Sequence, residues 1–111
     1  MNYRNLRVAK LIKEELSEIL MKELEFENAL ITINEVNVYK DLLNAKVRLG
    51  VLPVDKAPNA LKIIAKQAGF LRKLLLKKIN IKPMPYLSFE IDRGAEAAAD
   101  FDKAFLKSKN K

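Results

Sequence analysis

The sequence predicts a single α+β domain in which helices cover one face of a small sheet. Two observations predict this class: apolar residues recur at helical spacing in two long segments, and they alternate with polar residues in three short ones. The chain has 111 residues, half of them hydrophobic, which is enough for one core and leaves no room for a second. The expected order is helix, strand, strand, helix, strand and short terminal helix.

The first predicted helix spans residues 2–24. Its apolar residues are spaced three and four apart, as they are on one face of an amphipathic helix. This face comprises Val8, Leu11, Ile12, Leu16, Ile19, Leu20 and Leu24.

Two strands that form a hairpin are predicted next. Residues 29–39 alternate between apolar and polar positions, but the alternation slips by one residue, which predicts a bulge near Asn34 and Glu35. Residues 44–51 alternate without a slip, as in a strand with one buried face. Two cations, Lys46 and Arg48, fall on the open face of this second strand.

A second helix is predicted to begin near Pro58, because the N–H group that proline lacks is not needed in a first helical turn. Helical spacing continues to about Ile79. Gly69 lies in the middle, where glycine costs about 1 kcal/mol relative to alanine. The helix is therefore either kinked at Gly69 or keeps glycine there for a functional reason. Its apolar face comprises Leu61, Ile64, Ala65, Ala68, Leu71, Leu74 and Leu75.

The last part of the chain predicts a third strand and a short helix. Pro83 and Pro85 end helical structure, residues 87–91 alternate, and prolines at the start of a strand favour an edge position. After Gly94, the run AEAAADFDKAFLK is rich in helix formers. We therefore divide the chain into a domain over residues 1–94 and a short C-terminal helix with a basic tail over residues 95–111.

The composition argues against an enzyme. The chain has no cysteine and no histidine, which excludes disulfides, thiolate and imidazole catalysis and the usual zinc sites. Its three glycines are too sparse for a phosphate-binding glycine loop. Carboxylates such as Glu14 and Glu18 fit the solvated side of the first helix. We expect no catalysis, no cofactor, no metal and no small-molecule substrate.

The charge pattern bears on location and partners. No segment approaches the roughly 20 apolar residues of a membrane span, and charges interrupt the first 20 residues, unlike an export signal. We therefore expect a cytoplasmic protein. Its net charge of +7 is compatible with nucleic acid, an anionic membrane or an acidic protein.

The excess positive charge is local. No acidic residue occurs between Asp55 and Glu90, and this segment carries eight basic residues, which leaves 13 basic and 14 acidic residues elsewhere. Ordinary helix surfaces mix both signs. This asymmetry favours a polyanion such as RNA over a plain solvated surface. The eight basic residues are Lys56, Lys62, Lys66, Arg72, Lys73, Lys77, Lys78 and Lys82.

Five residues of this segment lie along one stripe of the second helix if that helix is straight. They are Lys62, Lys66, Gly69, Lys73 and Lys77, at intervals of four, three, four and four. The gap at glycine would let an RNA backbone approach the main chain. A helix break there would add N–H donors for a phosphate. We predict phosphate contacts from this stripe and from Arg72, Lys78 and Lys82.

The start of the first helix is a second candidate for phosphate contacts. Arg4, Arg7 and Lys10 lie near its N-terminus, where the helix dipole disfavours cations, although chance placement is an equal alternative. The three tyrosines are scattered along the sequence, so base stacking is poorly supported. Recognition of RNA shape and backbone is the predicted mode.

Three segments in this order resemble the bacterial ribosome-binding factor A family, almost from end to end. RVAKLIKEELSEIL resembles its first helix, and ITINEVNVYKDLLNAKVRLGV its hairpin, including the slip in alternation. AGFLRKLLLKKINIKPMPYLSFEID is similar to its signature run. The family usually has an Ala-x-Gly helix break, which corresponds here to Gln67, Ala68 and Gly69, with glutamine in place of the first alanine.

The resemblance implies a type II KH-like domain of order α-β-β-α(kink)α-β, with a three-stranded sheet and a short C-terminal helix. It implies binding to the immature small (30S) ribosomal subunit through its 16S rRNA, with a role in rRNA processing and assembly and in growth at low temperature. We expect the free protein to be a monomer. The alternative is a protein-interaction module that docks its basic helix face on an acidic partner. Peripheral membrane binding ranks last, because no exposed apolar helix face is predicted.

Overall fold

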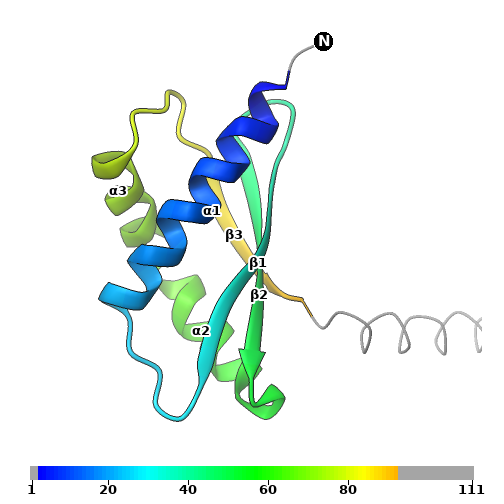
Figure 1. The fold of residues 1–111 in the computed structure, drawn as a ribbon, viewed down its shortest axis with the longest axis vertical. Coiled ribbons are helices and arrows are strands. Elements are labelled where there is room, and N and C mark those ends of the chain that lie inside the picture. Colours follow the sequence, from blue (N-terminus) through cyan, green and yellow to red (C-terminus); the bar gives the residue numbers. More distant parts are fainter. Residues whose placement is uncertain (1–2, 93–111) are drawn as a thin grey trace, which may run out of the picture.

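The computed structural model describes residues 3–92 and shows three helices packed on a three-stranded sheet (Figure 1). The C-terminal helix expected within residues 95–111 lies outside the described residues. The elements are α1 (Arg4–Glu23), β1 (Leu30–Val38), β2 (Asn44–Leu52), the short 3₁₀ helix η1 (Val54–Lys56), α2 (Ala57–Lys66), α3 (Ala68–Lys78) and β3 (Tyr86–Ile91).

The sheet has the strand order β1-β2-β3. Strands β1 and β2 form the predicted antiparallel hairpin, and their register shifts between Ile33 and Glu35, which confirms the predicted bulge. Strand β3 runs parallel to β2, because the chain crosses back through α2 and α3 before it enters β3. Because β3 is the last strand in the order, it lies at an edge of the sheet, as its prolines predicted.

The core lies between the helices and one face of the sheet. Helix α1 buries five residues in it, and every second residue of β2 from Ala45 to Val51 is buried. Leu11 shares the helical spacing of the predicted apolar face, yet it is 41% exposed. The neighbouring Ile12 faces the centre of the core, and Leu11 lies about 100° away from it around the helix.

The crossover helix is broken, but at Gln67 and not at Gly69. Helix α2 ends at Lys66 and α3 begins at Ala68, with Gln67 between them at φ −96° and ψ 8°. Ile64 of α2 and Leu71 of α3 are both fully buried, so the two helices present one continuous apolar side to the sheet across the break. The break therefore lies at the first residue of the triplet that corresponds to the family's helix break, two residues before Gly69 itself, whose own backbone is helical.

Candidate nucleic-acid interface

Four exposed lysines lie on the outer sides of α2 and α3, and we call them the α2–α3 lysines: Lys62, Lys66, Lys73 and Lys77. On α3, Lys73 and Lys77 lie on the side of the helix opposite Leu71 and Leu75, which are fully buried. No carboxylate within residues 3–92 forms a salt bridge with any of the four. The break at Gln67 divides the predicted stripe into two pairs on separate helices, each pair at a spacing of four residues.

Gly69 lies in the first turn of α3, on the same side as Lys73 and Lys77. A Cβ atom built at Gly69 would meet no atom within 4 Å, so the main chain is open to solvent here. The first N–H groups of a helix have no acceptor within the helix, which favours an anion beside them. Phe70 is 44% exposed next to this opening. Phe70 was not among the predicted site residues; an apolar side chain outside the buried spacing of Leu71 and Leu75 was the signal that could have identified it.

Two of the predicted phosphate contacts on α3 have partners inside the protein. The Arg72 guanidinium donates hydrogen bonds to the carbonyl oxygens of Met84, at 2.7 Å from Nη2, and of Pro85, at 3.2 Å from Nε. It also lies 4.3 Å from the ring centroid of Tyr86. Lys78 lies 3.4 Å from a carboxylate oxygen of Glu18 and 3.9 Å from one of Glu15 on α1. These side chains hold α3 to the loop before β3 and to α1.

We expect Arg72→Ala to lower the free energy of unfolding by about 2 kcal/mol, because charge-assisted hydrogen bonds to two carbonyl groups are lost. Lys73→Ala is the matched control, since the Lys73 side chain is exposed and forms no salt bridge within residues 3–92. Urea denaturation of both variants measures the difference. Equal stabilities would show that Arg72 does not clamp this loop.

The other predicted contacts lie at the start of α1 and in the loop before β3. The Arg4 guanidinium donates a hydrogen bond of 3.1 Å to the carbonyl oxygen of Lys82, which joins the two segments. Arg7, Lys10 and Lys82 are exposed. The structure therefore divides the predicted site residues into two groups, one on α2 and α3 and one at this end of the molecule.

On the open face of the sheet, both predicted cations have acidic partners within residues 3–92. Arg48 lies 2.7 Å from a carboxylate oxygen of Glu90 and 3.6 Å from one of Glu35, and Lys46 lies 3.7 Å from Glu90. The Glu90 carboxylate raises the pKa of the Arg48 guanidinium above its usual value, so this side chain stays charged. The two cations on this face were predicted from the sequence, but the acids that neutralise them were not.

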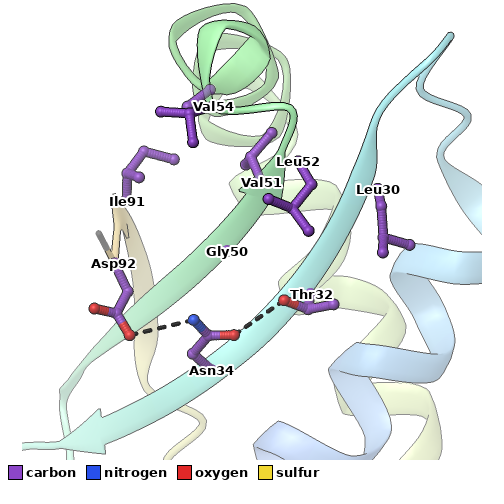
Figure 2. A pocket seen from close by; sticks show the side chains of 10 residues that line it. Leu30, Thr32, Asn34, Gly50, Val51, Leu52, Val54, Ile91 and Asp92 are labelled. Carbon is purple, nitrogen blue, oxygen red and sulfur yellow. Dashed lines mark hydrogen bonds between the residues drawn. The ribbon is translucent and has the colours of Figure 1, made fainter. Parts of the chain in front are cut away.

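A groove of about 340 Å³ lies at the end of the sheet where β3 ends (Figure 2). Its lining is mainly aliphatic, with Leu30, Leu52 and Val54 among the side chains drawn. Asn34 donates a 3.2 Å hydrogen bond to the carboxylate of Asp92 on one wall. With a carboxylate and no cation in its lining, the groove is unsuited to phosphate.

Residues 3–92 show neither a membrane-spanning helix nor a candidate metal site. None of its helices is both long and apolar enough to cross a membrane. Residues 3–92 also contain no group of three or more acidic side chains placed to hold a metal ion.

Comparison with known proteins identifies relatives along most of the chain. A family model described as Ribosome-binding factor A matches residues 4–105. The Ribosome-binding factor A of Polynucleobacter necessarius is 34% identical over 102 residues, which cover 91% of this chain and 83% of that protein. That of Acetivibrio thermocellus is 35% identical over 100 residues, which cover 87% and 81%.

Solved structures share the fold. The crystal structure of ribosome-binding factor A from Thermus thermophilus aligns with a TM-score of 0.69 at 21% identity, covering 81% of this chain and 98% of that one. The solution structure of a putative ribosome binding factor A from Thermotoga maritima aligns with a TM-score of 0.69 at 25% identity, covering 86% and 95%. A third match, also with a TM-score of 0.69, at 22% identity and covering 78% and 92%, is a homology model of the Thermus protein that was fitted into a cryo-EM map of a 30S complex.

Proposed function

Because the chain belongs to the ribosome-binding factor A family, we propose that it binds the immature small (30S) ribosomal subunit through 16S rRNA and assists rRNA processing and subunit assembly. The observation that carries this proposal is the family match over residues 4–105, and a homology model of a Thermus relative fitted into a map of a 30S complex supports it. The family is described by what it binds, and we propose no reaction for this chain. Small subunits are assembled in the cytoplasm, which is where this function places the protein.

The α2–α3 lysines are the proposed phosphate contacts. Their support is electrostatic: Lys62, Lys66, Lys73 and Lys77 are exposed, and no salt bridge to a described residue competes with a phosphate for them. The open main chain at Gly69 lies between the two pairs and leaves room for an RNA backbone.

Gradient sedimentation of a cell extract tests the proposed partner. We expect the protein to run with free small subunits and not with assembled ribosomes. RNase treatment separates this function from docking on an acidic protein, because a protein partner would survive the nuclease in a pull-down. Retention of all binding after digestion of the RNA would overturn the proposal.

The affinity for small subunits should fall steeply with salt. Each phosphate that a lysine neutralises releases condensed counterions, so four contacts give a slope of log affinity against log salt of roughly −3. Co-sedimentation of purified protein with small subunits at several potassium chloride concentrations measures this slope. A slope near zero would contradict phosphate contacts as the basis of binding.

A further inference from the structure

The three tyrosines, which are scattered in the sequence, lie at one end of the molecule. Tyr3 precedes α1, Tyr39 follows β1 and Tyr86 begins β3. Figure 1 shows the start of α1, the turn from β1 to β2 and the loop into β3 together at the top of the view. We call residues 3–10, 39–44 and 79–86 the tyrosine end.

Hydrogen bonds tie these three segments together. The side chain of Asn5 donates to the carbonyl oxygen of Val38, the residue before Tyr39, at 3.2 Å. The Arg4 guanidinium donates to the Lys82 carbonyl oxygen at 3.1 Å. A backbone hydrogen bond of 2.9 Å from the Tyr86 N–H to the Leu43 carbonyl oxygen also joins the loop into β3 to the turn between β1 and β2, so the arrangement is part of the fold.

Two of the tyrosines belong to one row across the sheet. The Tyr39 N–H donates to the Asn44 carbonyl oxygen at 2.9 Å, and Asn44 is the register partner of Tyr86. Neighbouring strands are about 4.8 Å apart, which puts the two tyrosine Cα atoms roughly 10 Å apart. Tyr3, Tyr39 and Tyr86 are 54%, 48% and 64% exposed, so all three rings are accessible.

The charge of the tyrosine end is positive. Its three segments contain five cations and one acid, Asp41. The Asp41 carboxylate accepts a 2.8 Å hydrogen bond from the Leu43 N–H, so it is engaged in its own turn. The Arg72 guanidinium lies over the Tyr86 ring, which keeps a further positive charge beside that tyrosine. The five cations are Arg4, Arg7, Lys10, Lys40 and Lys82.

We propose that the tyrosine end binds unpaired RNA nucleotides, whose bases stack on the tyrosine rings while the surrounding arginines and lysines attract the phosphates. Stacking on aromatic rings next to a basic surface is how proteins hold single-stranded RNA. A duplex keeps its bases stacked on one another, so it cannot use the rings in this way. The site is separate from the α2–α3 lysines and does not require the proposed function to hold.

Tyrosine fluorescence reports directly on this site. The chain has no tryptophan, so its intrinsic emission comes from the three tyrosines, all of which lie at the tyrosine end. We expect single-stranded octaadenylate to quench the emission of the full chain to saturation, and a blunt RNA duplex of equal length to quench it far less. Equal quenching by the two, or none by octaadenylate, would overturn the proposal.

Substitutions separate stacking from charge. Tyr39→Ala with Tyr86→Ala should weaken binding of fluorescein-labelled octaadenylate, measured by anisotropy, by about a hundredfold, since each stacked base contributes roughly tenfold. The matched pair Tyr39→Phe with Tyr86→Phe keeps both rings and should bind within about threefold of the original chain. If the variant with Tyr39→Ala and Tyr86→Ala does not fold, Tyr3→Ala with Tyr39→Ala replaces it in the same measurement, because this pair keeps the contact between Arg72 and Tyr86. Equal affinity of alanine and phenylalanine variants would exclude stacking.

The free oligonucleotide also keeps the two proposals distinguishable. A chain that binds octaadenylate but not small subunits would retain the tyrosine site and lose the proposed function. If the alanine variants lose small-subunit binding while octaadenylate quenches nothing, the tyrosine end contacts a protein, and the assignment of unpaired RNA is wrong.

Discussion

Replacing both Lys73 and Lys77 by glutamate is expected to lower the affinity for small ribosomal subunits by about a hundredfold. The variant loses two contacts between a cation and a phosphate, and each new carboxylate repels the phosphate nearby. A total loss of about 3 kcal/mol in binding free energy corresponds to the hundredfold change. The fold should be unaffected, because both side chains are exposed and neither forms a salt bridge within residues 3–92. Co-sedimentation at fixed salt measures the loss, and the salt slope should become shallower by roughly 1.5 to 2.

A single reversal elsewhere controls for net charge. Lys22→Glu changes the charge by the same amount as Lys77→Glu, but Lys22 lies in the last turn of α1 and outside the proposed contacts. We expect Lys77→Glu to weaken binding by about tenfold and Lys22→Glu by much less. Similar losses for both variants would mean that the net charge of the protein attracts the subunit. The α2–α3 lysines would then not be specific phosphate contacts.

Leu75→Ala is expected to lower the free energy of unfolding by about 3 kcal/mol, because it removes a fully buried side chain and leaves a cavity. Leu75 is 0% exposed and belongs to the core cluster that α1, α3 and the sheet share. A domain of this size is stabilised by about 5–15 kcal/mol, so this one change removes a large part of its stability.

The next residue along α3 provides a matched control. Leu76 has the same side chain but is 43% exposed, so Leu76→Ala should cost less than about 0.5 kcal/mol. Urea unfolding followed by circular dichroism measures both variants. Equal losses would mean that α3 does not present Leu75 to the core.

Local patterns were sufficient to predict most of the fold. Helical spacing located α1, and the slip in alternation located the bulge between Ile33 and Glu35. The prolines before β3 predicted its edge position. These features depend on which face of an element is buried, and burial is encoded in the spacing of residues within that element. The exposed faces of α2 and α3, with their four lysines, followed from the same spacing.

The order of the elements, their buried faces and the local excess of positive charge could all be predicted from the spacing of residues along the chain. Which charges have partners depends instead on how the elements pack: Arg48 pairs with Glu90 across two parallel strands, and Arg72 donates hydrogen bonds to the loop before β3. The tertiary structure also places the helix break at Gln67 and brings the tyrosines to one end of the molecule. These contacts join residues far apart in the chain, so the spacing within one element carries no information about them. They depend on how the sheet and helices pack.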